Sequence, residues 1–123
     1  MTGPSGGSLE DRLRALRAKN VDISAAVVAT LDGLPVASAA ASEADPDGVA
    51  ALAADLLQRA GRATEDVGAG AAQQVLVKGE RGYLMAVACG PEACLGCAAS
   101  LEASLGLLLL DVQRAADDLK GMV

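Results

Sequence analysis

The links between the apolar segments of this chain are short, and this constrains the fold more than any other feature of the sequence. Ile23 to Leu31 is small, apolar and partly β-branched, which predicts a buried strand. Asp32-Gly33 follows it and is the strongest short signal for a β-hairpin. The return strand, 34–40, contains Pro35, which cannot donate to a sheet ladder and therefore predicts a sheet edge. Three more strands are predicted at 73–78, 83–89 and 93–101.

Three amphipathic segments predict helices. Ser8 is a suitable N-cap for a helix that ends near Asn20. Asp45-Pro46 supplies an N-cap and a first helical residue for a long helix, and Gly68 is a natural residue to end it. A last helix is predicted at 105–120. The order is therefore α-β-β-α-β-β-β-α. Because hairpin-length links join antiparallel strands, we expect an α+β fold with a five-stranded antiparallel sheet and helices on both faces.

The composition indicates one small domain with a thin core. The chain has 123 residues, enough for one core, and we expect a disordered leader at 1–7 followed by a domain at 8–120. Alanine accounts for 27 residues, whereas Tyr83 is the one aromatic side chain. Aromatic side chains bury the most apolar area per residue, so this core depends on Leu, Val and Ala. A thin core favours further burial in an oligomer interface.

Charge and missing motifs argue against several classes of function. A net charge of -6 and the scarcity of aromatic residues argue against nucleic-acid binding. Glu102 and Asp111 interrupt the most apolar stretch, so no membrane insertion is expected. The sequence has no histidine, hence no Ser-His-Asp or Cys-His arrangement, and it has no Walker-type glycine loop. We therefore expect a cytoplasmic protein that is not an enzyme and needs no cofactor.

The cysteines, Cys89, Cys94 and Cys97, have two possible interpretations. The spacing of Cys94 and Cys97 is typical of metal and redox sites, but three cysteines without histidine leave a structural zinc site one ligand short. In a strand, residues three apart point to opposite faces, so these two thiols would not converge. We expect buried packing residues and no metal site. A thiol-based or small-ligand sensor is the alternative.

The long central helix carries two apolar stripes and one polar face. A broad stripe suits packing on the sheet, and a second stripe of small residues, rotated by roughly 110°, suits contact with a second copy across a two-fold axis. The alternative is that alanines fill an exposed face because they favour helices. The broad stripe comprises Val49, Leu52, Ala53, Leu56, Ala60, Ala63 and Val67. The expected dimer stripe comprises Ala50, Ala54, Leu57 and Gly61, and the polar face includes Asp55, Gln58, Arg59 and Arg62.

The predicted strand at 73–78 is a second source of self-association. It has no proline, and its only charged residue is Lys78 at its end. An unprotected edge strand of this kind tends to pair with another strand. In a homodimer it would pair with its own copy, which adds Val75 and Val77 to the expected dimer interface.

The order of these segments resembles the roadblock/dynein light chain family, and its bacterial members in particular. The resemblance covers residues 8–120 and implies a profilin-like α/β/α sandwich with strand order 2-1-5-4-3. It also implies a homodimer in which the third strands pair and the central helices lie side by side. The segments that carry it are Asp32 to Ser38, the alanine-rich helix 47–68, Gln74 to Val77, Arg81 to Leu84 and Ala103 to Gly106.

The same resemblance implies a partner. Bacterial relatives act with a small Ras-like GTPase, as activators or exchange-promoting cofactors, and they supply no catalytic arginine to it. We therefore expect a homodimeric module that binds and regulates such a GTPase, with Asp55, Gln58, Arg59 and Arg62 as the contact patch. The alternative is a structural scaffold dimer in a signalling complex of a sensor kinase and a GTPase, without nucleotide-dependent regulation.

Overall fold

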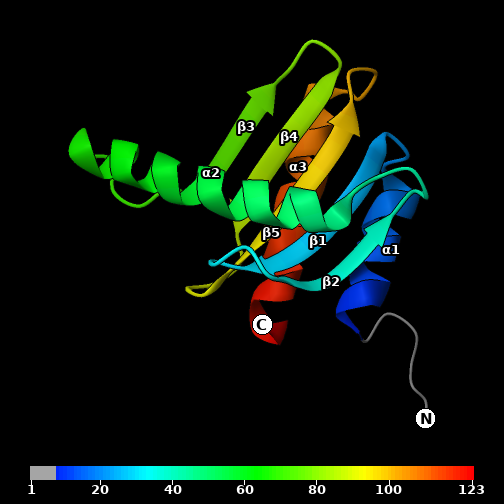
Figure 1. Ribbon diagram of the computed structural model, residues 1–123, viewed down its shortest axis with the longest axis horizontal. Helices are drawn as coiled ribbons and strands as arrows, with labels where there is room; N and C mark the ends of the chain where they lie inside the picture. The colour runs from blue at the N-terminus through cyan, green and yellow to red at the C-terminus, as the bar shows by residue number, and fades with distance from the viewer. Residues whose placement is uncertain (1–7) are drawn as a thin grey trace.

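The computed structural model describes residues 8–123, and its helices and strands follow the predicted order. The leader expected at 1–7 lies outside the described residues. The elements are α1 (Leu9–Lys19), β1 (Ile23–Thr30), β2 (Pro35–Ala40), α2 (Pro46–Asp66), β3 (Gln74–Lys78), β4 (Gly82–Ala88), β5 (Ala93–Ser100), α3 (Leu105–Leu119) and a short 3-10 helix, η1 (Lys120–Met122). Figure 1 shows α2 across one face of the sheet, with α1 and α3 on the other. The expected α+β sandwich is confirmed.

The five strands form one antiparallel sheet in the order β2-β1-β5-β4-β3, which is the order that the family resemblance implied. The edges of the sheet are therefore β2 and β3. Pro35 lies on β2, as predicted, next to a register shift between Val28 and Ala29 of β1. A proline on an edge strand breaks no hydrogen bond in the interior of the sheet. The other edge, β3, has no proline.

Glycine is required in the β1–β2 turn for two reasons. Gly33 has a φ of +89°, in the left-handed region that favours glycine. A Cβ at this position would also lie 3.1 Å from the Cα of Ala51 in α2. Close to this contact, the side-chain amide of Gln58 donates to the carbonyl of Leu31. One flank of α2 is thus held against the β1–β2 hairpin.

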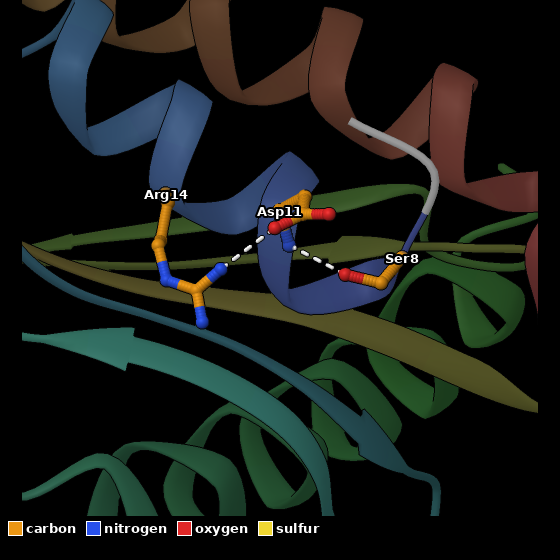
Figure 2. A network of polar contacts seen from close by, with 3 residues as sticks. All are labelled: Ser8, Asp11 and Arg14. Atoms are coloured by element: carbon orange, nitrogen blue, oxygen red, sulfur yellow. Dashed lines mark hydrogen bonds and ion pairs between the residues drawn. The ribbon is translucent and has the colours of Figure 1, made fainter. Parts of the chain in front are cut away.

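Side-chain caps begin two of the helices, as the sequence predicted. The hydroxyl of Ser8 accepts a hydrogen bond from the backbone N–H of Asp11 at 3.0 Å. Asp11 in turn accepts from Arg14 at 2.7 Å, so the first turn of α1 is a small polar network (Figure 2). Asp45 accepts from the backbone N–H of Gly48 at 3.1 Å and caps α2. A cap of this kind stabilises a helix by about 1 kcal/mol.

The sheet separates two cores of unequal side-chain size. The core beneath α1 and α3 contains the larger side chains, including Leu13, Leu16, Leu95, Leu108 and Leu119. The core beneath α2 is built mostly from small ones: Val27, Ala29, Ala50, Ala53, Ala54, Leu57, Ala86 and Cys94. Small side chains let α2 approach the sheet closely, because the distance between packed elements depends on the side chains at their contact.

The closest point of this approach is Gly96, in the middle of β5. A Cβ at Gly96 would lie 2.6 Å from the Cβ of Ala53, 3.3 Å from a methyl of Val49 and 3.4 Å from a methyl of Val27. The first of these distances is too short for two carbon atoms that are not bonded. Glycine in a strand interior often marks close approach of another backbone, and here α2 is the element that approaches.

We predict that Gly96→Ala lowers the free energy of unfolding by about 1–3 kcal/mol, because the added methyl forces α2 away from the sheet. The matched control is Gly61→Ala in α2, where a Cβ would have only one contact, at 3.8 Å from the nitrogen of Ala72. That variant should gain about 0.5–1 kcal/mol, since alanine favours a helix interior over glycine. Urea unfolding of both variants measures the difference, and equal stability would contradict the close contact.

Candidate interaction surface

The sheet-facing side of α2 is rotated from the predicted broad stripe, of which Ala53 is fully buried and Val49 packs beside it. Ala50, Ala53, Ala54 and Leu57 are the buried residues of this helix, and they pack on the sheet. The expected dimer stripe is therefore wrong for Ala50, Ala54 and Leu57, because their side chains are already covered by their own sheet. Gly61 continues this stripe and is half-buried. The physical reason is Gly96: where α2 lies closest to the sheet, at Ala53, only small side chains fit between them.

A different apolar flank of α2 is exposed. Leu52 is 56% exposed and Val67 is 79% exposed, while Leu56 is half-buried and Ala63 is exposed. At 100° per residue, these four positions share one flank, and it is the flank opposite the one that contacts the β1–β2 hairpin. Hydrophobic periodicity alone predicts all four on the sheet-facing stripe, so this part of the prediction is wrong. The isolated Gly96 in a predicted strand was the signal that could have corrected it, because such a glycine indicates close backbone approach.

The β3 edge lies beside the far half of α2, which extends past this strand in Figure 1. Val75 packs against the α2-side core, and Val77, two residues on, lies on the same side of the sheet and is 42% exposed. The backbone N–H of Gly79 donates to the carbonyl of Gly82, and that of Ala88 donates to the carbonyl of Gln73. These two bonds fix which residues of β3 direct their backbone groups toward β4 and which direct them outward. By this alternation, the outward N–H groups of β3 are those of Gln74, Leu76 and Lys78.

The four polar residues predicted as a contact patch lie on the side of α2 away from the sheet, and all four are exposed. Arg59 donates to Asp55 at 3.0 Å, an i, i+4 ion pair within the helix. Gln58 is turned to the hairpin through its bond to Leu31. Arg62 projects from the same side one turn beyond Gln58. On the helical wheel, Arg59 falls between the polar side and the Leu52 flank.

The sheet separates the thiols of Cys94 and Cys97, as predicted. Cys89 and Cys97 belong to the core under α1 and α3, and Cys94 belongs to the core under α2; all three are buried and free. Burial raises the pKa of Cys89 to about 12, that of Cys94 to about 11 and that of Cys97 to about 12. Reactive cysteines have lowered pKa values and partial exposure, so these thiols have the properties of packing residues.

An open hollow of about 620 Å³ lies under the second half of α2, on the hairpin side. Small apolar groups line much of it, among them Ala72, Ala88 and Pro91, with Glu65 and Lys120 as its charged members. Within residues 8–123, no group of three or more His, Cys, Asp or Glu side chains is placed to hold a metal ion. In the same range, no helix is both long and apolar enough to cross a membrane.

Residues 9–99 match the Roadblock/LC7 domain family. The chain belongs to this family. An uncharacterized protein of Methanocaldococcus jannaschii is 31% identical over 112 residues, which cover 91% of this chain and 97% of the relative. Roadblock domains are in general non-catalytic protein-interaction domains, which agrees with a surface of apolar flank and open strand edge.

Solved structures show the same fold. A Roadblock/LC7 domain from Streptomyces avermitilis superposes with a TM-score of 0.85 at 23% identity, covering 94% of this chain and 98% of that one. The protein MglB of Myxococcus xanthus superposes with a TM-score of 0.82 at 19% identity, covering 97% of both chains. These likenesses confirm the fold, with its order of helices and strands.

We predict that the stability of this roadblock domain falls as pH rises above about 8.5. The pKa of an unfolded thiol is about 8.5, whereas burial raises that of Cys94 to about 11 in the folded chain. Between these values the folded state binds more protons than the unfolded state, so unfolding is favoured by rising pH. Each thiol adds a slope of up to about 1.4 kcal/mol per pH unit.

Urea unfolding of the wild type and of Cys94→Ala, from about pH 7 to pH 10, measures this effect. The variant should lose the contribution of one thiol and show a shallower decline. Identical slopes in the two proteins would show that the Cys94 thiol ionises as easily in the folded chain as in the unfolded one.

Proposed function

We propose that this chain is a cytoplasmic, homodimeric, non-enzymatic module that binds and regulates a small Ras-like GTPase. The observation that carries the proposal is the exposed apolar flank of α2 beside the open β3 edge. Leu52, Val67 and Val77 are large apolar side chains on one side of the sheet, and a second copy would remove them from water. Family membership supports an interaction role, and the resemblance to bacterial members supports the choice of a GTPase.

The proposed dimer joins the two β3 strands antiparallel across a two-fold axis at Leu76. The outward N–H groups of β3 then bond to the second copy, and Val75 meets the second copy's Val77. The same axis sets the two α2 helices antiparallel and side by side. Leu52, Leu56 and Ala63 follow the i, i+4, i+11 spacing of one helix seam, so they replace the predicted small stripe in the interface.

We predict that Leu52→Glu halves the molar mass of the wild-type assembly. The two-fold axis buries Leu52 twice, and loss of about 2 kcal/mol per leucine weakens association roughly a thousandfold. Multi-angle light scattering at micromolar concentration measures the mass. The control is Leu34→Glu, which changes an exposed leucine in the hairpin, on the other flank of α2. A wild type that runs as a monomer, or a Leu52→Glu variant of unchanged mass, would reject this dimer.

The proposed GTPase surface is the polar side of the paired α2 helices. A two-fold dimer presents Asp55, Gln58, Arg59 and Arg62 twice. Charges at the rim of an interface mainly set encounter rate and specificity, while nearby apolar groups supply most of the binding energy. The arginines are therefore binding groups in this proposal and supply no catalysis. Nucleotide dependence would come from the switch segments of the GTPase, which rearrange between its GTP and GDP states.

We predict that Arg62→Glu weakens binding of the GTPase about three- to tenfold, since a surface charge contact is replaced by repulsion. Arg62 is the cleaner test, because Arg59 also borders the dimer seam. Arg14→Glu on α1 is the control, as Arg14 lies on the opposite face of the sheet. Calorimetry with a GTPase from the same genome, loaded with GDP or a non-hydrolysable GTP analogue, measures affinity.

The outcomes separate the two functions. Stronger binding in one nucleotide state, weakened by Arg62→Glu and unaffected by Arg14→Glu, supports a regulator. Equal binding in both states leaves the partner but removes the regulatory role. Absence of binding in both states leaves the scaffold function.

A further inference from the structure

The hollow under the second half of α2 stays open in the proposed dimer. It lies on the hairpin side of this helix, whereas the dimer uses the opposite flank with Leu52. Along the first half of α2 the hairpin side is closed, because the β1–β2 turn at Gly33 approaches Ala51. Gln58 and Leu31, which are joined by a hydrogen bond, line the end of the hollow nearest to this contact. Beyond them, the flank of α2 is no longer covered by the hairpin.

The size and lining of the hollow suit a large apolar group. Its volume is about 620 Å³, and small or apolar residues form most of its walls. Pockets that hold ligands have volumes of about 300–1,000 Å³ and mainly apolar linings. Leu57 and Ala93 line it and are buried, whereas Pro91 in the β4–β5 turn is an exposed lining residue. Because the hollow is open on one side, it can take a side chain that remains attached to another protein.

Gly61 lines the hollow and has no packing role within this chain. Outside its own helix, a Cβ at Gly61 would meet one atom of residues 8–123 within 4 Å, the nitrogen of Ala72 at 3.8 Å. Glycine in a helix interior lowers stability relative to alanine, so the fold alone disfavours it here. Glycine does allow a ligand to approach the backbone closely. The hollow therefore gives an incoming group direct access to the backbone of α2.

The hollow also has one charge without a partner in the described part of the chain. Within residues 8–123, the carboxylate of Glu65 makes no hydrogen bond or ion pair. The ammonium of Lys120, the other charged lining residue, lies 3.5 Å from a carboxylate oxygen of Asp117. Glu92 follows the lining residue Pro91 and is exposed. With a net charge of -6 on the whole chain, a cation on the incoming group is favoured.

We propose that this hollow, which we call the α2 pocket, binds an aromatic side chain of a partner protein that has a lysine or arginine beside it. The ring lies against Leu57 and the backbone of Gly61, and the cation pairs with Glu65. Aromatic residues and arginine are enriched among the residues that carry most of the binding energy of interfaces, and they cluster in desolvated pockets. The anchor comes from a different protein, because this chain has no Phe or Trp and its Tyr83 packs against the core under α1 and α3.

The α2 pocket belongs to a single chain. Its lining residues come from α2, the end of β1, the α2–β3 link, the β4–β5 turn and the end of α3. Binding to it therefore requires neither the proposed dimer nor a GTPase, and the proposed dimer would present two such pockets. The pocket selects partners by a pair of neighbouring side chains, one aromatic and one basic.

Fluorescence titration with two short peptides tests this chemistry. The peptides are Lys-Trp-Lys and Glu-Trp-Glu, each with an acetylated N-terminus and an amidated C-terminus. Because the chain has no tryptophan, tryptophan emission comes from the peptide alone. Burial of the ring should shift the emission of Lys-Trp-Lys to shorter wavelength. Glu-Trp-Glu should bind roughly tenfold more weakly, because its carboxylates meet Glu65 in place of a cation.

Two variants with matched controls place the peptide on the chain. Gly61→Leu fills the α2 pocket and should weaken binding of Lys-Trp-Lys roughly tenfold or more, because the apolar surface is already covered. Gly106→Leu is its control, since a Cβ on this glycine of α3 would also have open space. Glu65→Gln should weaken binding about two- to fivefold, as expected for a surface ion pair. Asp66→Asn removes the same charge one residue away, outside the lining, and is the second control.

The outcomes decide the proposal. Binding of Lys-Trp-Lys that Gly61→Leu and Glu65→Gln weaken and both controls preserve would support the α2 pocket. No shift of the peptide's emission with the wild type would overturn it, as would equal binding to the wild type and to a folded Gly61→Leu. Equal affinity for the two peptides would overturn the pairing with Glu65. A lower molar mass of Gly61→Leu in light scattering would identify a second copy as the occupant and overturn the choice of a different protein.

Discussion

The contact between α2 and the middle of β5 determines which side chains of α2 remain exposed at the surface. Gly96 has no side chain, so Ala53 and its small neighbours on α2 lie directly on the sheet. Because α2 lies so close to the sheet, Leu52 does not fit between them and stays exposed on the flank of the helix. The exposed flank is therefore a consequence of close packing, and large side chains become available for a second copy because small ones occupy the core.

The same constraint explains why so alanine-rich a chain would associate. The α2-side core buries few large side chains, and apolar stabilisation scales with the area removed from water. The core under α1 and α3 holds most of the buried leucines and supports the fold from the other face. Pairing of β3 edges and α2 flanks would extend the thin core across two chains.

Much of the fold could be predicted because its signals are local. Asp32-Gly33, the cap at Asp45 and the edge proline Pro35 each act within a few residues, and all three appear where the sequence placed them. The alternation of Cys94 and Cys97 across the sheet follows from strand geometry alone. The orientation of α2 could not be fixed in this way. Hydrophobic spacing defined two adjacent stripes, and only the distant contact between Ala53 and Gly96 determines which one meets the sheet.

Amide hydrogen exchange at β3 tests the central claim most directly. The N–H groups of Gln74, Leu76 and Lys78 point away from β4, so within one chain they have no strand to bond to. Pairing across the two-fold axis would bond them to the second copy. The account predicts that the Leu76 amide is strongly protected in the wild type and loses this protection in Leu52→Glu. Exchange of Leu76 in the wild type as fast as that of an exposed loop amide, at concentrations where the chain is associated, would contradict pairing through β3.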